Sequence, residues 1–247
     1  MNQGYKNQVQ LLLDVLPEVA KEDCFAMHGG TAINLFIRDL PRLSVDIDLT
    51  YVHIADRNKS LGEINKALIR IKQRIESSLP SIKIEHKADI CKLKISRQGT
   101  LIKIETNMVG RGLLGEPGKV QLCEIAQEEF DSFCVMPIVP FEQLYGGKIC
   151  AALDRQHPRD LFDVKLLLDN EGFSEKIKRG FIFCLLCSTR PMYELLQPNL
   201  IDQRTAFDQQ FEGMSAIDFS YDDFESTRNM LTTEIAESLN EKDKASL

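Results

Sequence analysis

Two aspartates at alternate positions of an extended segment are the first residues in this sequence that could do chemistry. Across residues 43–52 apolar and polar residues alternate, so Asp46 and Asp48 project from one face of a strand and their apolar neighbours from the other. Neighbouring carboxylates repel each other unless water or a cation surrounds them. Mg²⁺ prefers oxygen ligands and usually takes one or two protein carboxylates plus substrate phosphates. The pair therefore predicts either a solvated strand face or a magnesium site.

A pair of glycines precedes this strand. Gly29 and Gly30 follow a short apolar segment, residues 24–27, that is typical of a strand, and they precede a helical pattern over residues 31–38. Glycines at such a junction let the backbone approach a ligand closely, and N–H groups at a helix start attract anions. Most Gly-Gly pairs are ordinary turns, so the aspartates that follow give this pair its weight.

The hydrophobic periodicity around these residues predicts an α+β fold. A first helix is expected to end near Pro17, and a second to begin at the capping-box pattern Ser60-x-x-Glu63 and to run to about residue 79. Alternating segments predict strands that form a mixed sheet with helices against it, at residues 43–52, 81–87, 90–96 and 101–108. Helical patterns follow at residues 141–155, 158–170 and 174–189. We expect an α/β domain at residues 1–138 and a helical domain at 139–247.

The charge is distributed unevenly along the chain. The formal net charge of −7 arises within residues 202–247, which carry eleven acidic and four basic residues. Residues 57–103 instead carry twelve Lys or Arg against four Asp or Glu. A positive field beside an acidic site suits a protein that handles a polyanion. A solvated basic face is the alternative, because this segment has almost no aromatic residues for base stacking.

The cysteines and the hydropathy indicate a cytoplasmic protein. Seven cysteines are scattered without a disulfide spacing, and the N-terminus lacks the pattern of a signal peptide. The most apolar segment, residues 181–187, is far shorter than the roughly 20 residues that cross a membrane. Cys184-x-x-Cys187 lies in this segment without a second Cys or His pair, so we expect buried thiols rather than a metal or redox site.

Three motifs together resemble one known family. The string HGGTAINLFIRDLPRLSVDIDLTY, the segment KICAALDR from Lys148 and the segment RDLFD from Arg159 are similar to the AbiEii/AbiGii toxins, within the DNA polymerase β-like nucleotidyltransferase superfamily. The resemblance spans roughly residues 25–170. It implies a metal-dependent nucleotidyltransferase, usually the toxin of a toxin–antitoxin or abortive-infection pair. Characterised members use an NTP, and several add nucleotides to the 3′ end of tRNA.

The resemblance implies a Mg²⁺-dependent transfer of NMP from an NTP to RNA, with the tRNA 3′ end as the expected acceptor and a cognate antitoxin as a partner. Gly29 and Gly30 would hold the triphosphate through backbone N–H groups. Asp46 and Asp48 would bind two Mg²⁺ ions, one at the acceptor hydroxyl and one at the pyrophosphate. The nucleotide-binding set further includes Thr31, Arg42 and Ser44.

The family normally supplies a third carboxylate from a later strand of the sheet. Glu105 is our prediction, because it alternates with Ile102 and Ile104 and so points away from the core. It could bind the metal or accept the hydroxyl proton. A surface glutamate paired with a neighbouring lysine is the alternative, and Glu85 and Asp89 are weaker candidates.

Four residues of the helical half match the family's motifs. Lys148 would neutralise triphosphate charge as the nucleotide binds, and a solvated lysine is the alternative. Arg159, Asp160 and Asp163 would face the active site. They also have a local explanation, because acids stabilise the start of a helix behind Pro158 and Arg159 and Asp163 are spaced as an i,i+4 pair.

Two other functions remain open at this point. The same fold could use a small molecule or a protein side chain as the acceptor. The chain could also be a catalytically inactive module that binds a nucleotide or a partner, although the intact Asp46–Asp48 pair argues against inactivity.

Overall fold

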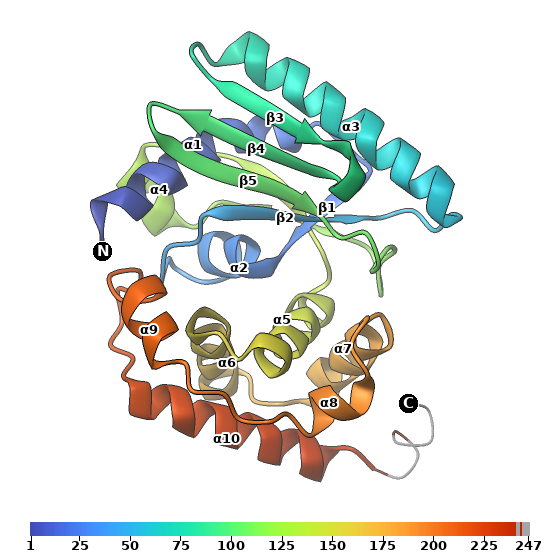
Figure 1. The fold of residues 1–247 in the computed structure, drawn as a ribbon, viewed down its shortest axis with the longest axis vertical. Helices are drawn as coiled ribbons and strands as arrows, with labels where there is room; N and C mark the ends of the chain where they lie inside the picture. Colours follow the sequence, from blue (N-terminus) through green and yellow to red (C-terminus); the bar gives the residue numbers. More distant parts are fainter. Residues whose placement is uncertain (241–242, 244–247) are drawn as a thin grey trace. The chain divides into compact units, whose positions relative to one another are not determined.

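The structure is a computed structural model that describes residues 1–240 and 243. Its contacts divide the chain into two compact units, Met1–Pro140 and a second unit that begins at Phe141. The N-terminal unit is a sheet with helices against it, and the C-terminal unit is helical throughout its described part (Figure 1). This architecture confirms the predicted α+β fold.

The sheet of the N-terminal unit is mixed, and its strands follow the order β3-β4-β5-β2-β1-β7-β6. Strand β2 pairs antiparallel with β1 and parallel with β5, so the strand that carries the aspartates lies inside the sheet. The strand bounds are β1 Phe25–His28, β2 Asp46–Tyr51, β3 Lys83–Lys87, β4 Lys92–Arg97, β5 Thr100–Thr106, β6 Gly118–Gln121 and β7 Val135–Ile138.

Two long helices, α1 (Gln3–Val19) and α3 (Arg57–Ser78), cover one face of this sheet (Figure 1). Apolar side chains from β2, β4 and β5 are buried against them, including Ile47, Leu93 and Ile104. Because side chains alternate along a strand, the residues between these apolar positions project from the opposite face. That opposite face is the one that carries Asp46 and Asp48.

Two helix boundaries differ from the prediction. Helix α1 continues past Pro17 to Val19, because a proline in the last turn removes only one hydrogen-bond donor near the end of the helix. Helix α3 begins after Asp56, whose carboxylate accepts the N–H of Lys59 at 2.9 Å, so the prediction of Ser60 as the cap is wrong. Ser60 is buried within the first turn.

The strands predicted at residues 81–87, 90–96 and 101–108 are present as β3, β4 and β5. Gln98 and Gly99 form the turn between β4 and β5 with φ values of +50° and +80°, as a tight hairpin requires. The predicted strand at residues 43–52 is shorter, since β2 begins at Asp46. Among the strands and α-helices of the N-terminal unit, three were not predicted: β6, α4 (Glu124–Phe130) and β7.

The helical unit contains α5 (Phe141–Arg155) and α6 (Pro158–Asn170), which coincide with their predicted ranges. Its other helices are α7 Glu175–Leu186, α8 Met192–Leu196, α9 Arg204–Gln210 and α10 Tyr221–Ser238. Helices α5 and α7 cross at Gly146 and Gly180, where a Cβ on Gly180 would lie 1.8 Å from the carbonyl oxygen of Glu142. In the described part of the chain, no helix has the length and hydropathy of a membrane span.

Candidate active site

Strand β2 presents its two aspartates on the face of the sheet opposite α1 and α3. Asp46 and Asp48 are half-buried, whereas Ile47 and Leu49 between and beyond them are fully buried. The predicted alternation is therefore confirmed. Thr50, the next residue on the polar face, is buried and lies 3.0 Å from Nδ1 of His28 on β1.

The first glycine of the pair lies directly against the second aspartate. Helix α2 (Gly29–Ala32) begins where β1 ends and continues as a π-helical turn over Ile33–Ile37. Gly29 has φ +77°, a left-handed conformation that favours glycine. A Cβ at this position would lie 2.3 Å from Oδ2 of Asp48. The backbone that could bind a phosphate and the carboxylate that could bind a metal are thus adjacent.

The second glycine contacts two of the other predicted residues. A Cβ on Gly30 would lie 2.7 Å from Nη2 of Arg42 and 2.9 Å from Oγ of Ser44. The guanidinium of Arg42 is buried, and its Nη1 donates to the carbonyl of Leu43 at 2.9 Å. Arg42 and Ser44 therefore fix the start of β2 beneath the glycines.

Thr31 connects the same helix to β2. Its buried hydroxyl donates to the main-chain carbonyl of Asp46 at 2.5 Å and lies 3.1 Å from the hydroxyl of Ser44. The side chain therefore positions Asp46, and a contact of Thr31 with a nucleotide would have to come from its backbone.

Glu105 lies on the same face as the aspartates. Asp48 and Glu105 are register partners in the parallel pair of β2 and β5, so their side chains project to the same side. The Glu105 carboxylate lies 2.5 Å from Nζ of Lys92 on β4, which is the ion pair considered as its alternative role. Its function as a metal ligand or base stays a prediction.

The chemistry of this site fits Mg²⁺ through two ligands. Asp46 and Asp48 supply carboxylate oxygens, Asp48 directly beside the backbone of Gly29, and Mg²⁺ commonly takes one or two carboxylates plus substrate phosphates. Across residues 1–240 and 243, no group of three or more His, Cys, Asp or Glu side chains is arranged to hold a metal ion. The pair of carboxylates is therefore the part of the predicted ligand set that the fold places together.

One residue near the aspartates had no predicted role. His28 is the register partner of Asp48 in the antiparallel pair of β1 and β2, and opposite residues in such a pair project to the same face. In the sequence, its position immediately before the glycine pair is the feature that could have marked His28 as a residue of the site.

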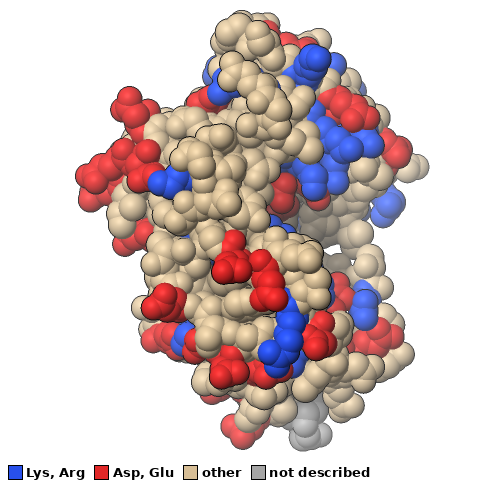
Figure 2. All heavy atoms as spheres, turned by 60° about the vertical axis from the view of Figure 1, so that its left-hand side comes forward, with Lys and Arg blue, Asp and Glu red and all other residues tan. Residues whose placement is uncertain are grey.

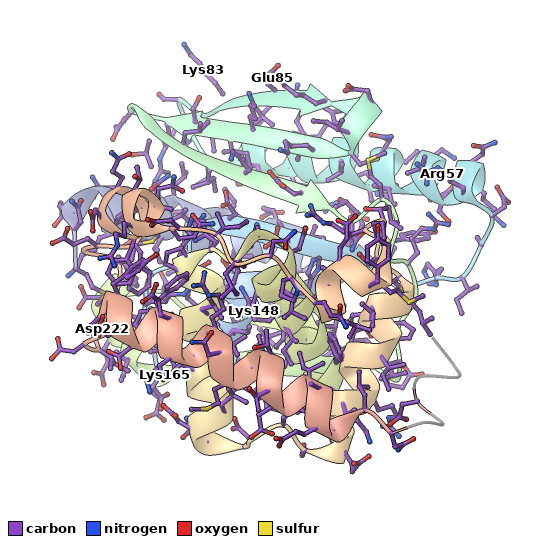
Figure 3. The ribbon with its side chains drawn as sticks, turned by 60° about the horizontal axis from the view of Figure 1, so that its bottom comes forward. Arg57, Lys83, Glu85, Lys148, Lys165 and Asp222 are labelled. Carbon is purple, nitrogen blue, oxygen red and sulfur yellow. The ribbon has the colours of Figure 1, made fainter. Side chains whose placement is uncertain are left out.

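A set of lysines continues the polar face away from the aspartates. We call it the lysine face, and it consists of Lys83, Lys87, Lys92, Lys94 and Lys103 on strands β3, β4 and β5. Figure 3 shows Lys83 and Glu85 projecting from the edge strand β3. Figure 2 shows Lys and Arg side chains gathered in a patch over this sheet.

The register of the strands sets like charges opposite each other in the lysine face. Lys94 faces Lys103, which in turn is the register partner of Asp46, and Lys87 faces Lys92. Like charges directly opposite destabilise a sheet. Within the described residues neither Lys94 nor Lys103 forms an ion pair, and each also has an acidic register partner, Glu85 for Lys94 and Asp46 for Lys103.

The helical unit brings together three of its predicted residues. Nζ of Lys148 lies 3.0 Å from Oδ1 of Asp160 and 2.9 Å from Oδ2 of Asp163, and the side chains are only 5%, 1% and 0% exposed. Arg155 adds a contact of 2.5 Å from its Nε to Asp160. The alternative of a solvated lysine is therefore wrong. Figure 3 shows Lys148 among the helices of this unit.

This cluster balances two positive and two negative groups. Burial by itself would raise the pKa of Asp160, but Lys148 and Arg155 outweigh burial and hold that pKa well below its usual range. A triphosphate that paired with Lys148 would have to compete with both aspartates, so its role at the nucleotide stays a prediction. Arg159 is half-buried, and its backbone N–H donates to Nδ1 of His157 at 3.2 Å.

Cys184 and Cys187 are half-buried, and their surroundings disfavour ionisation. Burial raises the pKa of Cys184 to about 12 and also raises that of Cys187, which disfavours the reactive thiolate.

Comparisons with known proteins identify the fold and the family of this chain. No curated protein sequence matches the chain. A solved structure of MenT4, a nucleotidyltransferase toxin from Mycobacterium tuberculosis H37Rv, has the same fold, with a TM-score of 0.69 and 12% sequence identity over 96% of this chain and 86% of that one. The model of the nucleotidyl transferase AbiEii toxin family, type IV toxin–antitoxin system, matches residues 10–241. The chain therefore belongs to the AbiEii family of nucleotidyltransferase toxins.

Proposed function

We propose that this toxin transfers NMP from an NTP to an RNA acceptor in a Mg²⁺-dependent reaction, and that the acceptor is the 3′ end of tRNA. The observation that carries the proposal is the Asp46–Asp48 pair, with the backbone of Gly29 against Asp48 and with Lys94 and Lys103 of the lysine face in register beside Asp46. A nucleotidyltransferase needs a triphosphate site, a metal site and an acceptor site, and these features supply one candidate for each.

In this proposal the chain binds the nucleotide through backbone groups and carboxylates. The N–H groups of Gly29 and Gly30 hold the triphosphate, and Asp46 and Asp48 hold Mg²⁺ against its phosphates. When bound, Mg²⁺ supplies charge neutralisation at the phosphates and lowers the pKa of the acceptor hydroxyl. Thr31 and Ser44 keep Asp46 in position, because their hydroxyls fix the start of β2.

The transfer step forms one bond and breaks one. The acceptor hydroxyl oxygen attacks the α-phosphorus, the bond between the α-phosphorus and its bridging oxygen to the β-phosphate breaks, and pyrophosphate leaves. The hydroxyl proton goes to a base, for which Glu105 is our candidate because it shares the face of Asp48. Glu105 would have to exchange its contact with Lys92 for this role.

The lysine face favours a polyanionic acceptor over a small molecule or a protein side chain. RNA phosphates would pair with Lys94 and Lys103, which lie in register with each other and with Asp46. Binding of this kind releases counterions and weakens as salt rises. An acceptor without a phosphate backbone would supply no phosphates to pair with these lysines.

The experiment combines purified protein, Mg²⁺ and total tRNA with each labelled NTP in turn. We expect label on RNA, a preference for one NTP and a steep loss of acceptor binding between low and high salt. The variant Lys94→Gln/Lys103→Gln should raise the KM for RNA and flatten its salt dependence, whereas Arg57→Gln/Lys59→Gln on the exposed start of α3 should not. Label on a protein or a small molecule and none on any RNA would overturn the RNA assignment.

A further inference from the structure

The helical unit contains a pocket that none of the predicted site residues lines. It lies in the segment from α9 to the start of α10 and has a volume of 340 Å³. This volume is at the small end of the range for ligand pockets, about 300–1,000 Å³. It suits one large side chain better than a nucleotide.

The bottom of the pocket is aromatic and firmly packed. Phe207, Phe211 and Phe219 line it, and Phe211 packs against the other two with ring centroids 5.3 Å and 5.5 Å apart. Phe162 on α6 supports Phe211 from within the unit, at 5.4 Å. The apolar surface is therefore pre-formed and would lose little conformational entropy when a ligand binds.

The edge of the pocket is acidic and uncompensated. Asp208, Glu212 and Asp218 line it and are exposed, and within the described residues none of the three forms an ion pair. Lys and Arg are absent from its described lining. Figure 2 brings the side of α9 forward and shows Asp and Glu side chains gathered there. The pocket thus joins an apolar floor to a negative rim.

We propose that this pocket docks a basic segment of a partner protein, with an aromatic side chain of the partner in the pocket and flanking Lys or Arg side chains at the three carboxylates. Charge complementarity selects this occupant, because the negative rim repels the phosphates of RNA. The site uses none of the residues proposed for nucleotidyl transfer. The two proposals therefore succeed or fail separately.

The probe for this site is the synthetic peptide acetyl-Arg-Lys-Phe-Lys-Arg-amide with 4-fluorophenylalanine at its centre, observed by fluorine NMR with the full chain. We expect saturable binding that weakens as NaCl rises from about 50 to 500 mM, because salt screens exposed ion pairs. The same peptide with a central Ala, detected by competition, should bind at least about tenfold more weakly, since it buries no aromatic ring.

Paired variants separate the pocket from general attraction to an acidic protein. Asp208→Asn/Asp218→Asn should weaken binding about fivefold, because the two exposed ion pairs together contribute roughly 1 kcal/mol. Glu234→Gln/Glu237→Gln on the exposed side of α10 makes the same charge change elsewhere and should alter binding less than twofold. Ile217 lines the pocket and is 48% exposed. Ile217→Ser should weaken peptide binding without changing the salt dependence of that binding.

Three results would overturn the proposal. The first is no saturable binding to a wild-type chain that thermal unfolding shows to be folded. The second is an equal loss of affinity in both double variants, which would mean that net charge alone attracts the peptide. The third is equal binding of the Phe and Ala peptides.

Discussion

Replacing Gly29 by Ala should disable the candidate site while leaving the protein folded. The new Cβ would lie 2.3 Å from Oδ2 of Asp48, whereas ordinary contacts of a Cβ begin near 3.4 Å, so the carboxylate or the glycine backbone must move by about 1 Å. A displacement of this size at reacting groups costs roughly a hundredfold in rate. The φ of +77° adds a strain of about 1–2 kcal/mol to the free energy of folding.

Gly99→Ala is the matched control for this prediction. Gly99 has nearly the same backbone conformation, with φ +80°, but a Cβ there would meet nothing within 4 Å. Gly99→Ala should therefore show the cost of the backbone conformation alone in urea unfolding, Gly29→Ala should lose at least as much stability, and only Gly29→Ala should lose NTP-dependent labelling of RNA. Transfer by Gly29→Ala within about threefold of Gly99→Ala would refute the placement of Asp48 against the glycine pair as a catalytic requirement.

Further predictions concern the helical unit. Gly180→Ala should destabilise it by about 3 kcal/mol or more, because its Cβ would lie 1.8 Å from a backbone oxygen of the crossing helix, whereas Gly147→Ala has room and should gain up to about 1 kcal/mol; thermal unfolding of both variants tests this. Asp160→Asn should lose about 1–3 kcal/mol at pH 7, since it removes the carboxylate that Lys148 and Arg155 share while Lys148 keeps its ion pair with Asp163. The folded pKa of Asp160 is depressed, so its stabilisation is present above the unfolded pKa of about 3.9 and is lost as pH falls below it. Urea titrations should therefore show the deficit of Asp160→Asn narrowing below about pH 4, and a constant deficit would contradict the ion-pair explanation.

The parts of the fold that the sequence predicted well have strong local signals. Helices α5 and α6 were predicted to the residue, because Pro140 precedes α5, Pro158 is the first residue of α6, and each helix carries a helical apolar pattern. The short strands β6 and β7 were missed. Each has four residues, and β7 is held by pairing with β1, which is more than a hundred residues away in the sequence.

In the candidate site, too, features set by neighbouring residues in the sequence were predicted, and features set by the tertiary fold were not. The alternation around Asp46 and Asp48 is local, and the fold keeps it. The burial of Lys148 could not be predicted, because lysine is normally solvated and its partners lie on the next helix. The lysine face was visible only as a basic stretch, since the register that sets Lys94 against Lys103 is a property of the sheet.

The measurement that tests the central claim most directly follows the two ends of the NTP separately. Protein, Mg²⁺ and tRNA are incubated with NTP labelled at the α- or the γ-phosphate, with Asp48→Asn as the control. The account predicts that RNA acquires the α-label and that the γ-label leaves as pyrophosphate. With Asp48→Asn, RNA should acquire no label and no pyrophosphate should be released, although the variant should unfold at the same temperature as the wild type. Transfer of the γ-label to the acceptor, or undiminished transfer by Asp48→Asn, would contradict nucleotidyl transfer at this site.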